Sequence, residues 1–306
     1  MNVVDRFIAS SLPFVPKPLV KRVANRYIAG ETDDDAMRVA AGLNLQGFRT
    51  TMDLLGEHVD TLGKARQAAQ HYMTLLDAIS QRKIVSTVSL KLTQLGLKVH
   101  ANECYSMAES VVRRAAELNN FVRIDMEDSS CTSGTIAIFR RLRQQHSNVG
   151  VAIQAYLRRT SDDISSLETL EGPEGTKPNI RLCKGVYVEP EEIAYREMAL
   201  INKNYLSILD RLLRAGWYVG IATHDEHIVR EATRMILELN LPTTAYEFQM
   251  LLGVNESLRN RIQADGHPLR VYIPFGSEWY AYSVRRLREN PRLAGYVLKA
   301  MLSAKL

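Results

Sequence analysis

The sequence predicts an α/β protein built as a (β/α)8 TIM barrel, with an N-terminal helical arm and a C-terminal helix over the barrel mouth. Eight short runs of apolar or β-branched residues recur at spacings of about 26 to 39 residues, and each precedes a segment with helical periodicity. Eight strand–helix repeats are the number that closes a parallel barrel. A doubly wound open sheet is the rival, but no GxGxxG follows the first run and no GxxxxGK[ST] occurs.

The predicted elements divide the chain into an arm over residues 1–46 and one barrel domain over residues 47–306, because no linker rich in Gly, Ser or Pro interrupts the repeats. In the arm, Pro16 and Pro18 suit the opening turn of a first helix, and Thr32 can cap a second. The expected strands cover 48–54, 84–92, 121–126, 149–155, 178–184, 217–222, 243–248 and 270–274.

The composition excludes several classes of protein. With 46% hydrophobic and 24% charged residues the chain can bury a sizeable core, which argues against disorder. Three cysteines without CxxC spacing support neither a zinc ribbon nor a disulfide framework, and neither a secretory segment nor a membrane-spanning run is evident. We therefore expect a reduced, cytoplasmic chain. The net charge of +5 includes no basic run of the nucleic-acid-binding kind, and scattered surface charge accounts for it.

Polar residues stand at the end of every predicted strand, where barrel enzymes carry their chemistry. One polar residue at a strand end is ordinary because strand ends face water, but a complete ring predicts a functional site. The ring consists of Asp53, Lys91, Asp125, Gln154, Arg181, Lys184, Thr223, His224, Gln249 and Tyr272.

Lys91 and Asp125 lie between apolar neighbours and are therefore expected to be buried. A lone buried charge is strongly unfavourable, so each needs a partner or a ligand. We predict a Lys91–Asp125 pair across adjacent strands, which could be structural or could flank a bound substrate.

Two further patterns lie in or near helices. Tyr282, Arg285, Arg286 and Glu289 share one helix face; this is either a solvated face or an arginine clamp for a carboxylate. His224 and His227 could share a metal-ligand face, but no third ligand stands at nearby spacing. We therefore expect no metal site, and we expect Asp225 and Glu226 to open a helix whose start could also receive a phosphate.

The ordered series of motifs resembles the proline dehydrogenase family, in its short monofunctional bacterial form. The resemblance covers nearly the whole barrel, whereas the arm matches only in being helical. The motifs are Asp53-Leu-Leu-Gly-Glu57, Ser89-Leu-Lys91-Leu, Arg123-Ile-Asp125-Met-Glu127, Gln154-Ala-Tyr156, Arg181-Leu-Cys-Lys184-Gly185-Val-Tyr187, Ala222-Thr-His224, Glu247-Phe-Gln249-Met-Leu251 and Tyr282-x-x-Arg285-Arg286-x-x-Glu289.

The resemblance implies a flavoprotein that oxidises L-proline to 1-pyrroline-5-carboxylate by hydride transfer to the N5 atom of FAD, the first step of proline catabolism to glutamate. Lys91, Arg285 and Arg286 would hold the substrate carboxylate, and Glu57 would pair with Arg285 and gate the pocket. Asp125, Tyr272, Tyr282, Leu251 and Glu289 would complete the pocket. FAD would be held by Gln154, Arg181, Lys184, Gly185, Val186, Thr223, His224 and Gln249, with Arg181 near N5.

The resemblance also implies partners. The electrons would pass to a membrane quinone, which requires at least transient peripheral contact with the inner face of the plasma membrane; Lys17 to Arg26 and the Leu293–Leu306 helix are candidates, and packing of both on the barrel is the alternative. The sequence shows no aldehyde dehydrogenase domain, so a separate pyrroline-5-carboxylate dehydrogenase would take the product. Two other hypotheses stay open: an aldolase or lyase with a Schiff base on Lys91 or Lys184, and a non-catalytic barrel that binds amino acids or anions.

Overall fold

The structure is a computed structural model, and it describes residues 21, 24–170, 172–280 and 282–283. The opening turn of the first predicted helix of the arm, with Pro16 and Pro18, lies outside the described residues. So do Arg285, Arg286 and Glu289, together with the Leu293–Leu306 segment. The division of the chain at residue 46 stays a prediction.

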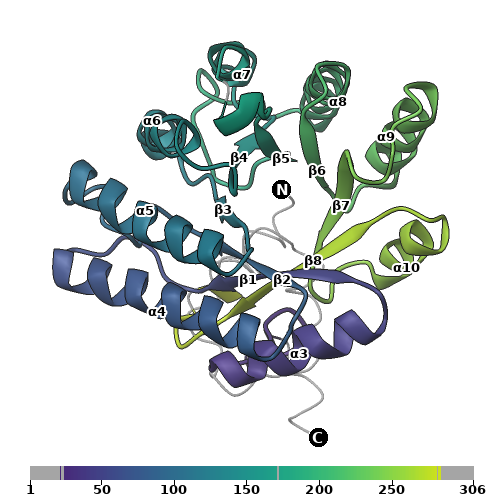
Figure 1. Ribbon diagram of the computed structural model, residues 1–306. Helices are drawn as coiled ribbons and strands as arrows, with labels where there is room; N and C mark the ends of the chain where they lie inside the picture. The colour runs from purple at the N-terminus through teal and green to yellow at the C-terminus, as the bar shows by residue number, and fades with distance from the viewer. Residues whose placement is uncertain (1–20, 22–23, 171, 281, 284–306) are drawn as a thin grey trace, which may run out of the picture.

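Eight parallel strands form one closed barrel in sequence order, because β1 pairs with both β2 and β8. Figure 1 shows these strands at the centre of the molecule, with the helices arranged around them. The strands are β1 (Arg49–Leu54), β2 (Ser86–Leu90), β3 (Val122–Ile124), β4 (Val149–Gln154), β5 (Asn179–Cys183), β6 (Tyr218–Ala222), β7 (Tyr246–Leu251) and β8 (Leu269–Phe275). The predicted TIM-barrel fold is confirmed.

One α-helix lies between each strand and the next along the chain, which is the connection that parallel strands require. The helices are α4 (Leu62–Gln81), α5 (Ala101–Glu117), α6 (Ser129–Arg143), α7 (Thr160–Glu168), α8 (Met198–Arg214), α9 (Glu226–Glu238) and α10 (Glu256–Ala264). A short 3-10 helix, η2 (Pro173–Gly175), follows α7. Among the described residues, no helix has both the length and the apolar character needed to span a membrane.

Helix α3 (Asp33–Leu45) precedes the barrel and lies beside β1 and β8 (Figure 1). Thr32 caps it as predicted: the hydroxyl accepts from the Asp35 N–H, and the Asp35 carboxylate accepts from the Thr32 N–H. The buried face of α3, with Ala36, Met37 and Ala40, belongs to the main core. The helix therefore forms one packed unit with the barrel.

The barrel has an apolar outside and a polar inside. Alternate residues of each strand point to opposite faces, so Val219 and Ile221 pack toward the helices while Gly220 faces the interior. Interior side chains include Arg123, which donates to the carbonyls of Val151 (3.1 Å) and Asn179 (2.7 Å). This polar filling is unusual for a barrel, whose interior normally carries branched apolar residues.

Three sequence-based placements need correction. Strand β7 begins three residues later than predicted, because Thr243 and Thr244 lie in a turn whose Ala245 N–H donates to the Pro242 carbonyl. Lys91 stands just beyond β2, in a turn that the Lys91 carbonyl closes by accepting from the N–H of Gln94. Tyr272 lies in the middle of β8 and does not end it.

Candidate active site

One cavity of about 550 Å³ opens among the carboxyl ends of the strands. It brings together every predicted substrate and cofactor residue within the described chain: Lys91, Asp125, Gln154, Arg181, Lys184, Gly185, Val186, Thr223, His224, Gln249, Leu251, Tyr272 and Tyr282. The sequence predicted no substrate or cofactor contact for eight further lining residues: Asp53, Met126, Ala152, Cys183, Tyr187, Ala222, Asp225 and Met250. Asp53 and Asp225 carried a signal, one as a strand-end carboxylate and the other as a helix opener.

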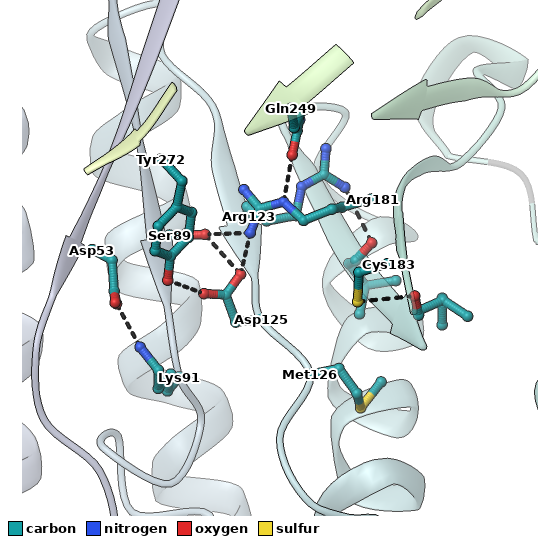
Figure 2. Close-up of polar contacts among 12 residues, drawn as sticks. Asp53, Ser89, Lys91, Arg123, Asp125, Met126, Arg181, Cys183, Gln249 and Tyr272 are labelled. Atoms are coloured by element: carbon teal, nitrogen blue, oxygen red, sulfur yellow. Dashed lines mark hydrogen bonds and ion pairs between the residues drawn. The ribbon is translucent and has the colours of Figure 1, made fainter. Parts of the chain in front are cut away.

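Asp125 is the centre of the hydrogen bonds in this cavity (Figure 2). Its Oδ1 accepts from the Ser89 hydroxyl at 2.8 Å and from Nη1 of Arg181, and its Oδ2 accepts from the Tyr272 hydroxyl at 2.7 Å. Arg181 Nη1 also donates to Ser89 at 3.0 Å. The carboxylate is therefore held by three residues from three different strands, which fixes its orientation.

Tyr272 packs against the same guanidinium. The Arg181 guanidinium carbon lies 5.2 Å from the centre of the Tyr272 ring, within the range of a cation–π contact. Burial, followed by the charges of Asp125 and Asp53, raises the pKa of Tyr272 well above its ordinary value. The hydroxyl is therefore protonated at neutral pH and acts as a donor to Asp125.

The predicted Lys91–Asp125 pair is wrong. Lys91 Nζ instead donates to Oδ1 of Asp53 at 2.6 Å, and both side chains are almost fully buried (Figure 2). Burial by itself lowers the pKa of Lys91, but the charges of Asp53 and Asp125 outweigh it and raise that pKa above its ordinary value. Arg181, from across the barrel, takes the place beside Asp125 that the sequence assigned to Lys91.

A third ion pair lies at the opposite rim. Lys184 Nζ contacts Oδ2 of Asp225 at 2.5 Å, and Asp225 caps α9 by accepting from the His227 N–H at 2.9 Å. Burial by itself raises the pKa of Asp225, but the hydrogen bond and charge of Lys184 lower it below the ordinary value. The predicted helix start at Asp225 and Glu226 is thus confirmed.

Two features of the cavity wall suit a bound group. The side chain of Gln154 is 3% exposed, and its Oε1 has no hydrogen-bond partner among the described residues. Gly185 has φ +112°, and a Cβ at this position would overlap the ring of Tyr156. The wall therefore offers a buried acceptor and a stretch of backbone that only glycine can form at this φ.

The remaining predicted residues line the cavity or lie near it. His224 Nε2 accepts from the N–H of Leu251 at 3.2 Å, which ties the ends of β6 and β7 together. Tyr282 packs with Leu55 and Trp279 above the strands. Glu57 is half-buried in the loop after β1 and is not a lining residue; its predicted partner Arg285 is outside the described chain, so the gate stays a prediction.

The charges of the described cavity are balanced. Lys91, Arg181 and Lys184 each contact one carboxylate, so three ion pairs surround an apolar surface that includes Met126 and Leu251. A concave pocket with a few convergent polar groups is the usual form of a small-molecule site. The arrangement can orient a compact, charged substrate beside a flat apolar group.

A closed (β/α)8 barrel with such a cavity at the carboxyl ends of its strands is the architecture of a barrel enzyme. The proline dehydrogenase family model matches residues 36–297, and the chain belongs to that family. It is therefore an oxidoreductase of proline catabolism that oxidises proline.

Curated relatives and a solved structure support this assignment. The chain is 35% identical to a proline dehydrogenase of Deinococcus radiodurans, over 92% of this chain and 90% of that protein, and 33% identical to proline dehydrogenase 1 of Bacillus subtilis (strain 168), over 91% and 90%. Proline utilization A of Bdellovibrio bacteriovorus, in a crystal structure inactivated by N-propargylglycine, superposes with a TM-score of 0.82 and 27% identity. That match covers 88% of this chain and 33% of the larger protein.

Proposed function

We propose that this enzyme uses FAD to oxidise L-proline to 1-pyrroline-5-carboxylate and passes the electrons to a quinone. The single observation that supports this best is the cavity itself, whose lining contains both the residues predicted to hold proline and the residues predicted to hold FAD. In the reaction the ring carbon next to nitrogen loses a hydride, the amine loses a proton, and a C=N bond forms. The product would be taken by a separate pyrroline-5-carboxylate dehydrogenase.

The wall residues fit a flavin nucleotide. Gln154 offers a buried oxygen to which no described residue donates, and this suits an N–H of the flavin ring; the Gly185 backbone can approach a ligand closely. Lys184 adds a cation that suits a phosphate group. When bound, FAD supplies the two-electron acceptor that no side chain provides, taking the hydride at N5.

The protein's own residues would bind and orient the substrate. Lys91 Nζ has three donors and uses one for Asp53, which leaves donors for the substrate carboxylate. Tyr272 and Leu251 would close around the ring and exclude water. Arg285 and Arg286 remain the predicted additional clamp. The substrate carboxylate needs their positive charge, because every cation of the described cavity already pairs with a carboxylate of the protein.

The structure disfavours the aldolase alternative. A Schiff base requires a neutral amine, whereas Lys91 and Lys184 each contact a carboxylate. Burial by itself lowers the pKa of Lys91, but the charges of neighbouring carboxylates outweigh burial and raise it. A non-catalytic binding barrel is excluded by membership of the enzyme family.

Absorbance spectroscopy tests the proposal. The purified protein, reconstituted with FAD if necessary, should show a flavin spectrum that L-proline bleaches under anaerobic conditions, whereas D-proline or L-alanine should leave it unchanged. A soluble quinone should then restore the oxidised spectrum faster than dioxygen does. A protein that stays colourless with excess FAD contradicts the proposal that FAD is the cofactor. If quinone restores the oxidised spectrum no faster than dioxygen, the proposal that quinone is the electron acceptor is wrong.

A further inference from the structure

A second set of polar contacts lies deeper in the barrel, below the cavity. Glu247 and Gln249 stand two residues apart on β7 and therefore face the interior together. Glu247 is 2% exposed, and its Oε1 accepts from Nε2 of Gln249 at 2.8 Å. Gln249 Oε1 in turn accepts from Nε of Arg181 at 2.6 Å (Figure 2). Glu247 itself is not a lining residue of the cavity.

We propose that Glu247 is a positioning residue: it fixes the orientation of the Gln249 amide, and through that amide it holds the Arg181 guanidinium against Asp125 at the floor of the cavity. The proposal concerns the polar interior below the cavity, and its activity measurements rest on the proposed function. No direct contact of Glu247 with substrate or cofactor is required.

The chemistry of the three groups permits only one amide orientation. A carboxylate only accepts hydrogen bonds and a guanidinium only donates them. An amide between the two must turn its NH2 group to Glu247 and its oxygen to Arg181. Without the carboxylate, the amide could rotate and present NH2 to the guanidinium, which would leave a buried donor facing a donor.

Glu247 is a firm anchor because it is held on its other side. Arg270 holds it with both Nε and Nη2, at 2.5 and 3.1 Å, whereas Arg49 is a more exposed and more distant neighbour, 3.5 Å from Oε2. Arg270 Nη1 also donates to the Thr50 carbonyl at 2.6 Å, which links the carboxylate to β1. Burial by itself raises the pKa of Glu247, but the charge and hydrogen bonds of Arg270 lower it, so the carboxylate is ionised at neutral pH.

The neighbouring strand leaves room for this arrangement. Gly220 lies on β6 and pairs with Glu247 on β7. A Cβ at Gly220 would lie 2.5 Å from Nε2 of Gln249. Real Cβ atoms do not approach so closely, so any larger residue there would displace the amide. Gly220→Ala therefore perturbs the Gln249 amide without changing any charge, which provides a test that is independent of Glu247.

The experiment compares three variants as FAD-loaded enzymes. Glu247→Gln removes the obligate acceptor, Gly220→Ala displaces the amide, and Arg49→Gln removes a cation from the outer side of Glu247 while leaving the Gln249 contact. We expect the first two to lower kcat by about tenfold, the scale of one lost charged hydrogen bond, with a smaller change in KM and a shifted visible flavin band. Arg49→Gln should match the wild type in all three readouts.

Two results would overturn the proposal. If Glu247→Gln lowers only the melting temperature and leaves kcat and the flavin band unchanged, Glu247 is purely structural. If Gly220→Ala behaves as wild type while Glu247→Gln and Arg49→Gln both change the band, the effect is that of charge and not of amide orientation.

A measurement without cofactor separates this proposal from the proposed function. The 15N resonance of Arg181 Nε, assigned through Arg181→Lys, reports the hydrogen bond to Gln249 in the protein as purified. It should move in Glu247→Gln and Gly220→Ala but not in Arg49→Gln. If the wild type fails to bind FAD yet these shifts occur, the proposed function is wrong and the positioning role stands; unmoved resonances reject the positioning role.

Discussion

At the scale of single residues, the cavity depends on charges that are buried in pairs. Replacing buried pairs by apolar groups is often neutral for stability, whereas removing one partner leaves an uncompensated charge. Asp53 illustrates this, because it is fully buried and its Oδ2 has no hydrogen-bond partner among the described residues. Burial, together with the charge of Asp125, raises the pKa of Asp53, and Lys91 opposes that effect.

Lys91→Met should therefore destabilise the fold by about 3–5 kcal/mol, because Asp53 loses the one cation that pairs with it in the described part of the chain. The double variant Asp53→Asn/Lys91→Met should recover a large part of that loss. Urea unfolding of the wild type, both single variants and the double variant measures the coupling between the two positions. Additive effects would show that the ion pair contributes nothing specific. Neither lysine variant should oxidise proline normally if Lys91 holds the carboxylate.

Tyr272 should set the size of ring that the cavity accepts. Its phenol lines the cavity and its hydroxyl is already used by Asp125, so it offers little to a hydroxyl on the substrate ring. Burying an unpaired hydroxyl costs about 1–3 kcal/mol, so proline should be preferred over 4-hydroxyproline by at least roughly tenfold in kcat/KM. Tyr272→Ser should narrow this ratio, while Tyr272→Phe, which keeps the ring, should preserve it. If Tyr272→Ser lowers kcat/KM for both substrates by the same factor, Tyr272 does not determine the preference for proline.

At the scale of elements, the repeats in the sequence predicted every strand, because each strand is a short apolar or β-branched run followed by a segment with helical periodicity. For Lys91, the neighbours Leu90 and Leu92 indicate that the side chain is buried but do not indicate which residue pairs with it. Arg181, on β5, reaches across the interior and pairs with Asp125, so Lys91 pairs with Asp53 instead. Likewise, Glu247 looked like one more motif residue, since its contacts to Gln249 and Arg270 exist only in the closed barrel.

The packing of α3 on α4 should depend on pH. His71 Nε2 lies 2.7 Å from Oδ1 of Asp33, and this hydrogen bond raises the pKa of His71 above its ordinary value. A raised histidine pKa contributes stability that is fully present below about pH 6.5, the ordinary value, and is lost as pH rises through the folded value. Because both side chains are partly exposed, the contribution is about 0.2–1 kcal/mol.

Urea unfolding of wild type and His71→Asn at a series of pH values checks this. The advantage of the wild type should be largest at about pH 5.5 and should disappear by about pH 8.5. A difference that stays constant across the range would mean that His71 packs as a neutral side chain. Asp33→Asn, which removes the partner of His71 and leaves the imidazole in place, is the control and should abolish the trend.

At the scale of the whole molecule, one cavity joins the ends of strands that are far apart in sequence. Lining residues come from β1 and β8 as well as from β4 to β7, so a ligand that fills the cavity contacts most of the barrel at once. Its binding free energy should therefore appear as stability of the whole fold. Since the family generally uses a flavin, FAD is the ligand expected to show this linkage.

FAD at about 100 times its Kd should stabilise the protein by about 2.7 kcal/mol, which for a chain of this size is a rise of several degrees in Tm. Removing FAD by dialysis should reverse the rise.

Gly185→Ala should reduce the FAD-dependent rise in Tm, because the new Cβ overlaps Tyr156 and displaces the backbone at the cavity wall. The matched control is Gly216→Ala, which has φ +71° and open space around its Cβ: it carries similar backbone strain in the turn between α8 and β6, away from the cavity. Both variants should lower the Tm of the cofactor-free protein. Thermal unfolding with and without FAD then separates this loss from the contribution of the Gly185 backbone to FAD binding. An equal FAD-dependent rise in wild type, Gly185→Ala and Gly216→Ala would show that the flavin does not use this stretch of backbone.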